Sequence, residues 1–249
     1  MNTVTVRDLV LGEGLPKICV PIVAHTYAEL EAALDEIDPD ACDLVEFRAD
    51  FYFEEDFPAL ERIREKIGNR PLLYTIRTKE EGGEIDLSQE AYEARTLAAA
   101  EWIDLADIQL GRIHFAASRS AVHSSVVHRL HEKGVKVVGS WHDFDRTPPT
   151  EKLILAVKQM QEEGCDICKI AVMPENRQDV IRLIRASLQL QEQEADRPFI
   201  TLSMGNLGRI TRAAGNFTGS CITYGMAGKQ SAPGQINAGL LRDILRALS

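Results

Sequence analysis

The sequence predicts an α/β fold of a single domain, a (β/α)8 barrel of the TIM type that extends over residues 1–249. Eight apolar runs rich in β-branched residues recur along the chain, and most begin about 30 residues apart, which is the length of one strand–helix unit. Helical patterns separate the runs, and such alternation is typical of a parallel sheet. Eight units in 249 residues favour a closed barrel over an open doubly wound sheet.

Each apolar run is expected to form one strand of the barrel. The runs begin at Lys17, Asp43, Pro71, Asp104, Val135, Cys165, Pro198 and Gly219, and they read KICVPIVA, DLVEFRA, PLLYTIR, DLADIQL, VKVVGSWHD, CDICKIAVM, PFITLSM and GSCITYG. The residues before Lys17 are expected to form a short N-terminal extension. No Gly-x-Gly-x-x-Gly follows the first run, which argues against a dinucleotide site.

Four helices are predicted between the runs from their apolar spacing and their end signals. They cover residues 26–37, 88–102, 149–164 and 174–193. Pro149 and Thr150 are start signals for the third of these helices, and Gly164 ends it. Pro174 predicts the first turn of the fourth helix, and acidic residues follow it, as the positive end of a helix dipole favours.

Composition narrows the classes of function that the chain can have. The formal net charge is -10 and no basic block is present, so nucleic-acid binding is not expected to be the main task. No apolar run approaches the ~18 residues that a membrane span needs, and the first residues do not form a secretory signal. Five cysteines, an odd number, predict free thiols in a reducing cytoplasm.

Cys165 and Cys168 form a Cys-x-x-Cys pattern, which is a spacing found in metal and redox sites. On a strand, residues three apart point to opposite faces, so the two thiols are expected to diverge. The sequence has no second cysteine pair that would complete a zinc site. We therefore expect no metal at this pattern.

Polar side chains are expected at the carboxyl-terminal rim of the barrel, where the βα-loops of this fold carry active sites. Inward residues alternate along each strand, and four strands end in inward polar groups. These groups are Glu46 and Arg48, Thr75 and Arg77, Ser140 and His142, and Lys169. Met204 of the seventh strand faces the same rim. The fourth strand leaves two orientations open, with either Asp107 and Gln109 or Ile108 and Leu110 pointing inward.

Lys169 lies within an apolar strand, where an ammonium group is costly to desolvate. Burial and nearby arginines both favour the neutral amine, which is a nucleophile for a carbonyl carbon and gives a Schiff base. The protonated imine withdraws electrons from the neighbouring carbon, and His142 has a suitable intrinsic pKa to take a proton from that carbon. The alternative is a structural ion pair between Lys169 and Glu46.

Two glycine-containing segments follow strands at this rim. RTKEEGGEI, residues 77–85, places Glu80 and Glu81 where a carboxylate could orient an imidazole. YGMAGKQSAPGQI, residues 224–236, has the small residues of a lid, and it carries Ser231 and Gln235 as hydrogen-bond donors. Arg212 offers a planar fork for a carboxylate. We therefore expect a substrate with a carbonyl, a carboxylate and hydroxyls that face Glu46, Arg48 and Arg77.

The chain resembles the type I 3-dehydroquinate dehydratases over nearly its whole length. The stretches that carry this resemblance, in order, are DLVEFRAD, RTKEEGGE, GSWHDFDRTP, CDICKIAVMP, TLSMGNLGRITRAAGNFTGS and SAPGQI. The resemblance implies a lyase that converts 3-dehydroquinate to 3-dehydroshikimate in the shikimate pathway of aromatic amino acid biosynthesis. It also implies a (β/α)8 barrel, a homodimer, and no metal or organic cofactor.

The resemblance further implies a role for each site residue. Lys169 matches the lysine that forms an imine with the C3 ketone, His142 the group that takes the C2 proton and delivers one to the C1 hydroxyl, and Glu81 the carboxylate that positions the histidine. The substrate carboxylate and the lid are matched by Arg212, Ser231 and Gln235. The ring hydroxyls are matched by Glu46, Arg48 and Arg77, and the apolar wall by Met204.

Two alternatives to this function remain open from the residues. A class I aldolase acting on a small hydroxy-ketone would share the Schiff-base lysine but would cleave a carbon–carbon bond. A non-catalytic barrel would bind a carboxylate ligand without turnover. An arginine matched to a carboxylate on a compact ring favours the dehydratase.

Overall fold

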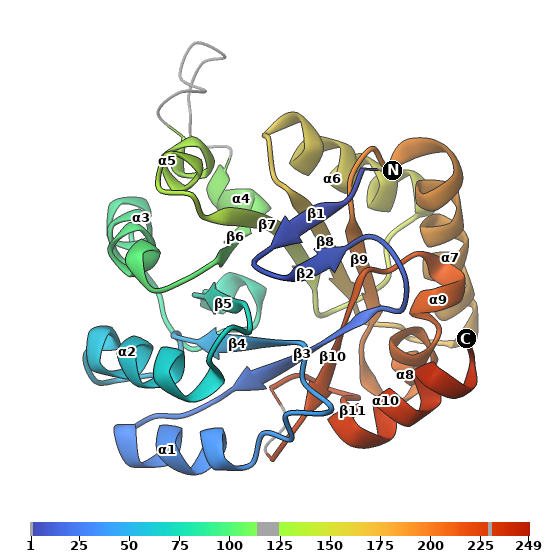
Figure 1. Ribbon diagram of the computed structural model, residues 1–249. Helices are drawn as coiled ribbons and strands as arrows, with labels where there is room; N and C mark the ends of the chain where they lie inside the picture. Colours follow the sequence, from blue (N-terminus) through green and yellow to red (C-terminus); the bar gives the residue numbers. More distant parts are fainter. Residues whose placement is uncertain (1, 114–124, 229–230) are drawn as a thin grey trace.

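The computed structural model describes residues 2–113, 125–228 and 231–249, and it has a barrel of eight parallel strands at its centre (Figure 1). The strands are β3 (Lys17–Ile22), β4 (Leu44–Arg48), β5 (Leu72–Thr75), β6 (Leu105–Gln109), β7 (Lys136–Asp143), β8 (Ile167–Val172), β9 (Phe199–Ser203) and β10 (Ile222–Met226). Each strand coincides with one predicted apolar run. Strands β3 to β9 pair in sequence order, and β10 pairs with β3.

Closure of the barrel depends on the contact between β9 and β10. Phe199 and Ser220 form a parallel bridge, and the Cys221 N–H donates to the Phe199 carbonyl at 2.8 Å. The short strand β11 (Ile236–Asn237) adds to the end of β10. Because β10 pairs with β3 on one side and contacts β9 on the other, the sheet closes on itself, and the (β/α)8 prediction is confirmed.

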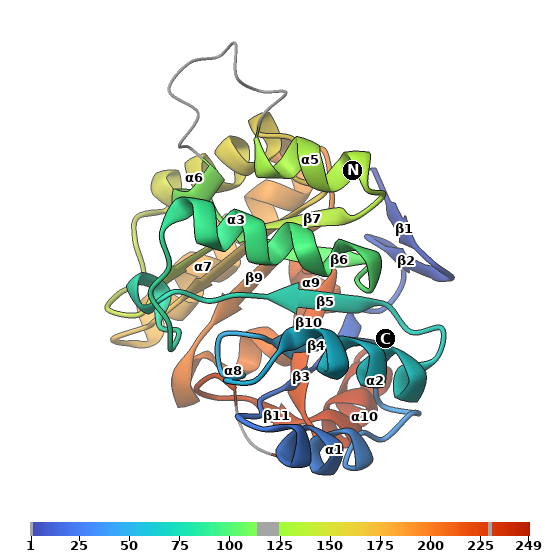
Figure 2. The same ribbon diagram turned by 90° about the vertical axis from the view of Figure 1, so that its left-hand side faces the viewer.

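Helices surround the strands on the outside (Figures 1 and 2). They are α1 (Tyr27–Asp35), α2 (Asp56–Ile67), α3 (Gln89–Ala98), α4 (Leu110–Ile113), α5 (Val126–Glu132), α6 (Thr150–Glu162), α7 (Arg177–Gln189), α8 (Gly205–Ala213), α9 (Gly215–Thr218) and α10 (Ala238–Ala247), with single turns at η1 (Lys79–Glu81), η2 (Ala99–Glu101) and η4 (Leu190–Glu194). The four helices predicted from the sequence are all present. No helix among the described residues is long and apolar enough to cross a lipid bilayer.

Helix α7 begins later than Pro174 predicted. Its first residue is Arg177, and Asn176 is the N-cap, with its side chain accepting from the backbone N–H groups of Gln178 and Asp179. Asp179 completes a capping box by accepting from the N–H of Asn176. Three satisfied backbone donors outweigh the preference of proline for a first turn, so Pro174 lies in the preceding loop.

Alternation along the strands gives the barrel two apolar layers. Outward side chains such as Val45 and Phe47 pack against helix residues such as Leu60 in the layer between strands and helices. Inward side chains make a second layer at the amino-terminal half of the barrel, formed by Leu44, Leu73, Leu105, Val138, Ile167, Ile200 and Ile222. These inward residues lie below the polar rim, so the interior is a packed floor and not a pore.

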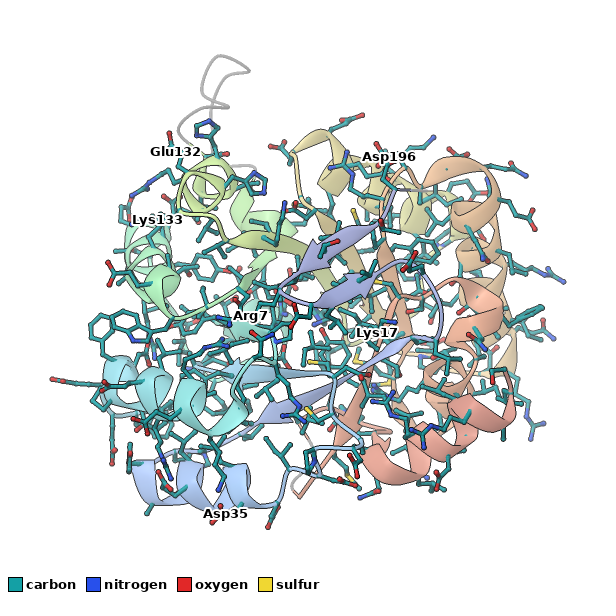
Figure 3. The ribbon with its side chains drawn as sticks, in the orientation of Figure 1. Arg7, Lys17, Asp35, Glu132, Lys133 and Asp196 are labelled. Carbon is teal, nitrogen blue, oxygen red and sulfur yellow. The ribbon has the colours of Figure 1, made fainter. Side chains whose placement is uncertain are left out.

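The N-terminal extension is a β-hairpin that covers this floor. Strands β1 (Val4–Val6) and β2 (Leu9–Leu11) pair antiparallel, and Val6 and Leu11 join the inward apolar layer. The Arg7 Nε donates to Asp104 Oδ1 at 2.6 Å, and the Asn2 N–H donates to the Asp196 carbonyl at 2.7 Å. Figure 3 labels Arg7 and Asp196, which lie toward opposite ends of the hairpin. The amino-terminal end of the barrel is therefore closed.

All five cysteines are free and buried. The prediction that the thiols of Cys165 and Cys168 point to opposite faces of the strand is wrong. Both thiols lie in the layer between strands and helices. Cys165 precedes the first residue of β8, so the alternation of the strand does not reach it. Burial raises the pKa of Cys168 to about 12, which keeps its thiol protonated at neutral pH.

We predict that Leu11→Ala will lower the free energy of unfolding by about 2–5 kcal/mol, since a fully buried leucine that seals the floor would leave a cavity. Urea unfolding of purified protein measures this change. Leu155→Ala is the control, because Leu155 lies on the outer face of α6 with 54% of its surface exposed, and it should change stability by less than about 0.5 kcal/mol. Equal effects of the two substitutions would contradict the role of the hairpin.

Candidate active site

A cavity of about 160 Å³ opens at the carboxyl-terminal rim of the barrel. All ten site residues predicted from the sequence line it: Glu46, Arg48, Arg77, Glu81, His142, Lys169, Met204, Arg212, Ser231 and Gln235. The remaining lining residues are Thr75, Gly82, Phe144, Ala171, Leu202, Tyr224, Ala232 and Pro233. Side chains that lie up to 189 positions apart in the chain, from 46 to 235, are therefore brought to one place by the strand order.

Strand register sets the depth of each group in the cavity. Ser140 on β7 is the register partner of Lys169 on β8, and His142 is the partner of Ala171 one level higher. Because Ile167 lies inward below Lys169, the amine stands directly above the apolar floor. Only 5% of the surface of Lys169 is exposed.

The imidazole of His142 is held by Glu81. The Nδ1 of His142 lies 2.8 Å from Glu81 Oε2, and Glu81 is buried while His142 is partly buried. Glu81 sits in the turn η1, where Gly82 has a φ of 78°. Gly83 packs so closely that an added Cβ would lie 1.8 Å from the Arg77 carbonyl oxygen. The two glycines therefore let the chain turn tightly enough to aim the Glu81 carboxylate at the ring.

Burial disfavours the charged forms of both partners in this pair. Burial and the cations Arg77, Lys169 and Arg48 lower the pKa of His142 well below its ordinary value. Burial raises the pKa of Glu81 to about 7, although Arg77 opposes that shift. A neutral imidazole is therefore present near neutrality, and its Nε2 is left to act on a ligand when Nδ1 binds Glu81.

Asp107 answers the question that the fourth strand left open, because it points into the barrel. Its Oδ2 accepts from Lys169 Nζ at 3.1 Å, and its Oδ1 accepts from Arg77 at 2.8 Å and from the Ser140 hydroxyl at 2.5 Å. Gln109 also points inward, where its Oε1 accepts from the Thr78 N–H at 2.9 Å. The sequence did not identify Asp107 as a site residue because both faces of that run contain apolar residues.

Lys169 forms an ion pair with Asp107, so the alternative considered from the sequence, an ion pair with Glu46, is wrong. Glu46 instead accepts a hydrogen bond from Thr75 Oγ1 at 2.8 Å. The ring of Tyr224 covers the amine, with Lys169 Nζ 4.6 Å from the ring centroid. This distance allows a cation–π interaction, which adds to the attraction between Asp107 and a positive nitrogen.

Arg48 is fixed by a second buried carboxylate that the sequence did not reveal. Its Nε and Nη2 donate to the two oxygens of Asp50 at 2.8 and 2.7 Å, and Asp50 is fully buried. The Nη1 of Arg48 donates to the Ser231 carbonyl at 3.4 Å, which joins the rim to the segment after β10. A bidentate pair of this kind limits the guanidinium to one orientation.

Arg212 and the segment after β10 form a further part of the cavity wall. Arg212 is 1% exposed, its Nη2 donates to the Pro233 carbonyl at 3.1 Å, and its Nε has no hydrogen-bond partner among the described residues. Burial lowers the pKa of Arg212 to about 10, so the group is still a cation at neutral pH. The predicted lid includes positions 229 and 230, which lie outside the described residues.

Ser231 and Gln235 are joined to each other. The Ser231 N–H donates to Gln235 Oε1 at 2.8 Å, and Gln235 Nε2 donates to Ser231 Oγ at 2.9 Å. Met204 and Leu202 provide apolar surface in the same cavity. Among the described residues, no group of three or more His, Cys, Asp or Glu side chains could hold a metal ion.

Comparison with known proteins agrees with this geometry. The family model of the type I 3-dehydroquinases matches residues 18–249. The 3-dehydroquinate dehydratase of Syntrophotalea carbinolica is 46% identical over 255 aligned positions, which cover 100% of this chain and 98% of that protein. The 3-dehydroquinate dehydratase of Clostridium novyi is 39% identical with the same coverage.

Solved structures give the same result. The type I 3-dehydroquinate dehydratase of Clostridium difficile, solved with covalent modified comenic acid, has a TM-score of 0.91 and 37% identity and covers 99% of this chain and 98% of its own. The 3-hexulose-6-phosphate synthase of Salmonella typhimurium, at 16% identity and a TM-score of 0.58, shares the fold alone. With a family model over residues 18–249 and relatives of this identity over the whole chain, the protein belongs to the type I 3-dehydroquinase family.

Proposed function

We propose that this enzyme dehydrates 3-dehydroquinate to 3-dehydroshikimate through an imine on Lys169. The observation that carries the proposal is that a buried lysine and an imidazole held by Glu81 lie in one cavity that also contains arginine donors. Relatives named 3-dehydroquinate dehydratase support the substrate and the reaction. The covalent modification named for the Clostridium difficile enzyme supports a covalent mechanism.

Substrate orientation follows from where the charges lie. The unpartnered Nε of Arg212 and the Ser231–Gln235 pair are suited to bind the carboxylate of the substrate. Glu46, Arg48 and Arg77 are suited to bind the ring hydroxyls, and Met204 packs against the carbon skeleton. This placement directs the C3 ketone toward Lys169.

The Lys169 ammonium first gives one proton to His142 Nε2, and the lone pair of the resulting amine attacks the C3 carbonyl carbon while the electrons of the C=O bond move to oxygen. A proton passes from nitrogen to that oxygen to give the carbinolamine. Its hydroxyl then takes the proton held by His142 and leaves as water, and a protonated imine remains on nitrogen. Burial of Lys169 between the apolar floor and the ring of Tyr224 excludes bulk water that would hydrolyse the imine early.

The elimination uses His142 twice. Its Nε2 removes the C2 proton, and the electrons of that bond move toward the positive imine to give an enamine. The enamine then expels the C1 hydroxyl, which receives a proton from the imidazolium and leaves as water. Glu81 keeps the ring oriented by binding Nδ1, and it stabilises the transient imidazolium. Hydrolysis of the conjugated imine releases the product and restores Lys169.

The two alternative functions predict different products from the same cavity. A class I aldolase would release two fragments, whereas the dehydratase gives a conjugated enone that absorbs in the ultraviolet. A binding protein would show neither change on mixing with 3-dehydroquinate. Fragment formation without the enone absorbance would favour the aldolase.

Assembly and location are also part of the proposal. Relatives of the family led us to expect a homodimer, and we propose a homodimer in the cytoplasm. Five free and buried thiols are consistent with a reducing compartment. Sedimentation velocity would measure the mass of the assembly.

We predict that 3-dehydroquinate and borohydride together will add a stable mass to the peptide that contains Lys169, because borohydride reduces an imine to an amine. Lys169→Ala should show no added mass and should lower turnover on the order of 10⁴-fold or more. Lys66→Ala changes an exposed lysine on α2 and should keep both the adduct and the activity. Adduct formation at another lysine would contradict the assignment.

We predict that His142→Ala will lower turnover by about 10²–10⁴-fold, the usual contribution of a general acid–base group, while the imine still forms. Quenched-flow mass spectrometry should therefore show the unreduced adduct accumulating during turnover. His131→Ala is the control, because His131 is an exposed histidine on α5 that pairs with Asp166, the residue before β8. This substitution should not alter the rate. Near-normal turnover by the His142 variant would remove histidine from the mechanism.

We predict that the ring of His142 will stay neutral as the pH falls through 6.5, because burial and three nearby cations lower its pKa. NMR of protein labelled with ¹⁵N-histidine measures the titration, and His142→Gln assigns the signal. Neutral imidazole should therefore still be present below pH 6.5, and turnover should continue to depend on it there. A His142 signal that titrates at or above pH 6.5 would contradict the electrostatic description of the site.

A further inference from the structure

Asp107 touches the reactive amine, and the mechanism proposed above gives it no part. Its side chain is fully inaccessible to solvent, and the Oδ2 atom lies 3.1 Å from Lys169 Nζ. Arg77 and Ser140 hold the other oxygen at 2.8 and 2.5 Å. Three strands therefore fix this carboxylate beside the atom at which the imine would form.

Condensation conserves the positive charge on that nitrogen. The ammonium R–NH3⁺ and a ketone O=C give the protonated imine R–NH⁺=C and one molecule of water, so a single positive charge is present before and after the step. Only the protonated imine withdraws electrons strongly from the neighbouring carbon. An anion fixed beside the nitrogen stabilises both positive forms relative to their neutral forms.

We propose that Asp107 is a positioning residue that acts as the counter-ion of the protonated imine on Lys169. This inference rests on the proposed function, because it requires that the imine forms. The carboxylate does not exchange a proton in this role. It keeps the imine protonated while His142 removes the C2 proton.

The surroundings of Asp107 support an ionised carboxylate. Burial would raise the pKa of Asp107, but the charges of Arg77 and Lys169 outweigh burial and hold it below its ordinary value. The Ser140 hydroxyl donates to the carboxylate, which favours the ionised form further. A carboxylate in this state is a weak base but a strong counter-ion.

Other charged or titratable groups also face this point from the neighbouring elements, and any pH profile includes them. They are Cys19 on β3, Glu46 and Arg48 on β4, Arg77 in the segment after β5, Glu81 on η1, Tyr92 on α3, His142 on β7, Arg212 on α8 and Tyr224 on β10. In the described part of the chain, the carboxylate within hydrogen-bond distance of Lys169 Nζ is that of Asp107 and not one of these groups.

The test is Asp107→Asn, which keeps the size of the side chain and removes its charge. We expect the alkaline limb of the profile of kcat against pH, measured with 3-dehydroquinate from pH 6 to 10, to move toward acid by about one pH unit or more. The imine of the variant should lose its proton at a lower pH because its anion is gone. A merely structural role would lower kcat at every pH without moving the limb.

Asp50→Asn is the matched control. Asp50 is an equally buried carboxylate at the same rim, but it binds the guanidinium of Arg48. Its substitution should raise KM and leave the alkaline limb of kcat in place. A limb that stays within about 0.3 pH unit of wild type in Asp107→Asn, or that moves equally in both variants, would overturn the inference.

A measurement on the wild-type enzyme covers the case in which Asp107→Asn fails to fold. Raman spectroscopy of the trapped imine reports its protonation, because the C=N stretch of a protonated imine shifts in deuterium oxide. We expect that shift to persist at pH 8, and its absence would overturn the inference. If wild-type enzyme forms no adduct with borohydride, the proposed function itself fails. If the adduct forms but the limb does not move, only the role of Asp107 fails.

Discussion

The carboxylate of Asp107 lies between two cations, Lys169 and Arg77, that would otherwise repel each other. Lys169 and Arg77 are both buried cations, and placing them in one cavity without an anion would be costly. Asp107 binds the two of them with separate oxygens, while Ser140 donates to one of those oxygens. Strands β5, β6, β7 and β8 are therefore joined at the rim by one hydrogen-bonded group of side chains.

The same arrangement separates two chemical tasks. The amine on β8 lies deep, against the apolar floor and beneath the ring of Tyr224, where water has little access. The imidazole on β7 lies one register step higher, where Glu81 holds it from the loop after β5. The proposed nucleophile and the proposed proton carrier therefore lie at different heights of one wall of the cavity.

The hairpin that closes the amino-terminal end of the barrel affects the electrostatics of the cavity at the other end. The β1–β2 hairpin seals the amino-terminal mouth with Val6 and Leu11, so the inward apolar layer is covered from below as well as above. A dry floor keeps the effective dielectric low around the buried charges, which strengthens every ion pair at the rim. Stability of the floor and electrostatics of the site are therefore linked through the same core.

The barrel strands and most of the residues that line the cavity could be predicted from the sequence. Apolar runs at a regular spacing determined all eight barrel strands, because a parallel strand buried on both faces must be apolar almost throughout. Alternation then placed Glu46, Arg48, Arg77, His142 and Lys169 at one rim, since inward residues of a strand recur every second position. The segment after β5 offered Glu80 and Glu81, and the family resemblance selected Glu81, whereas the segment after β10 added Ser231 and Gln235.

Other features were decided only by the tertiary structure. The ion-pair partner of Lys169 is Asp107 and not Glu46, because strand register and the tilt of the barrel, which no single strand reveals, set which side chains meet. The buried partner of Arg48 is Asp50. Helix α7 begins at Arg177, with Asn176 as its N-cap, and not at Pro174, since local hydrogen bonds outweighed residue preference. The sequence by itself determined which chemical groups face the cavity, and the packing of the strands decided which of them pair, because pairing depends on distances between segments remote in the chain.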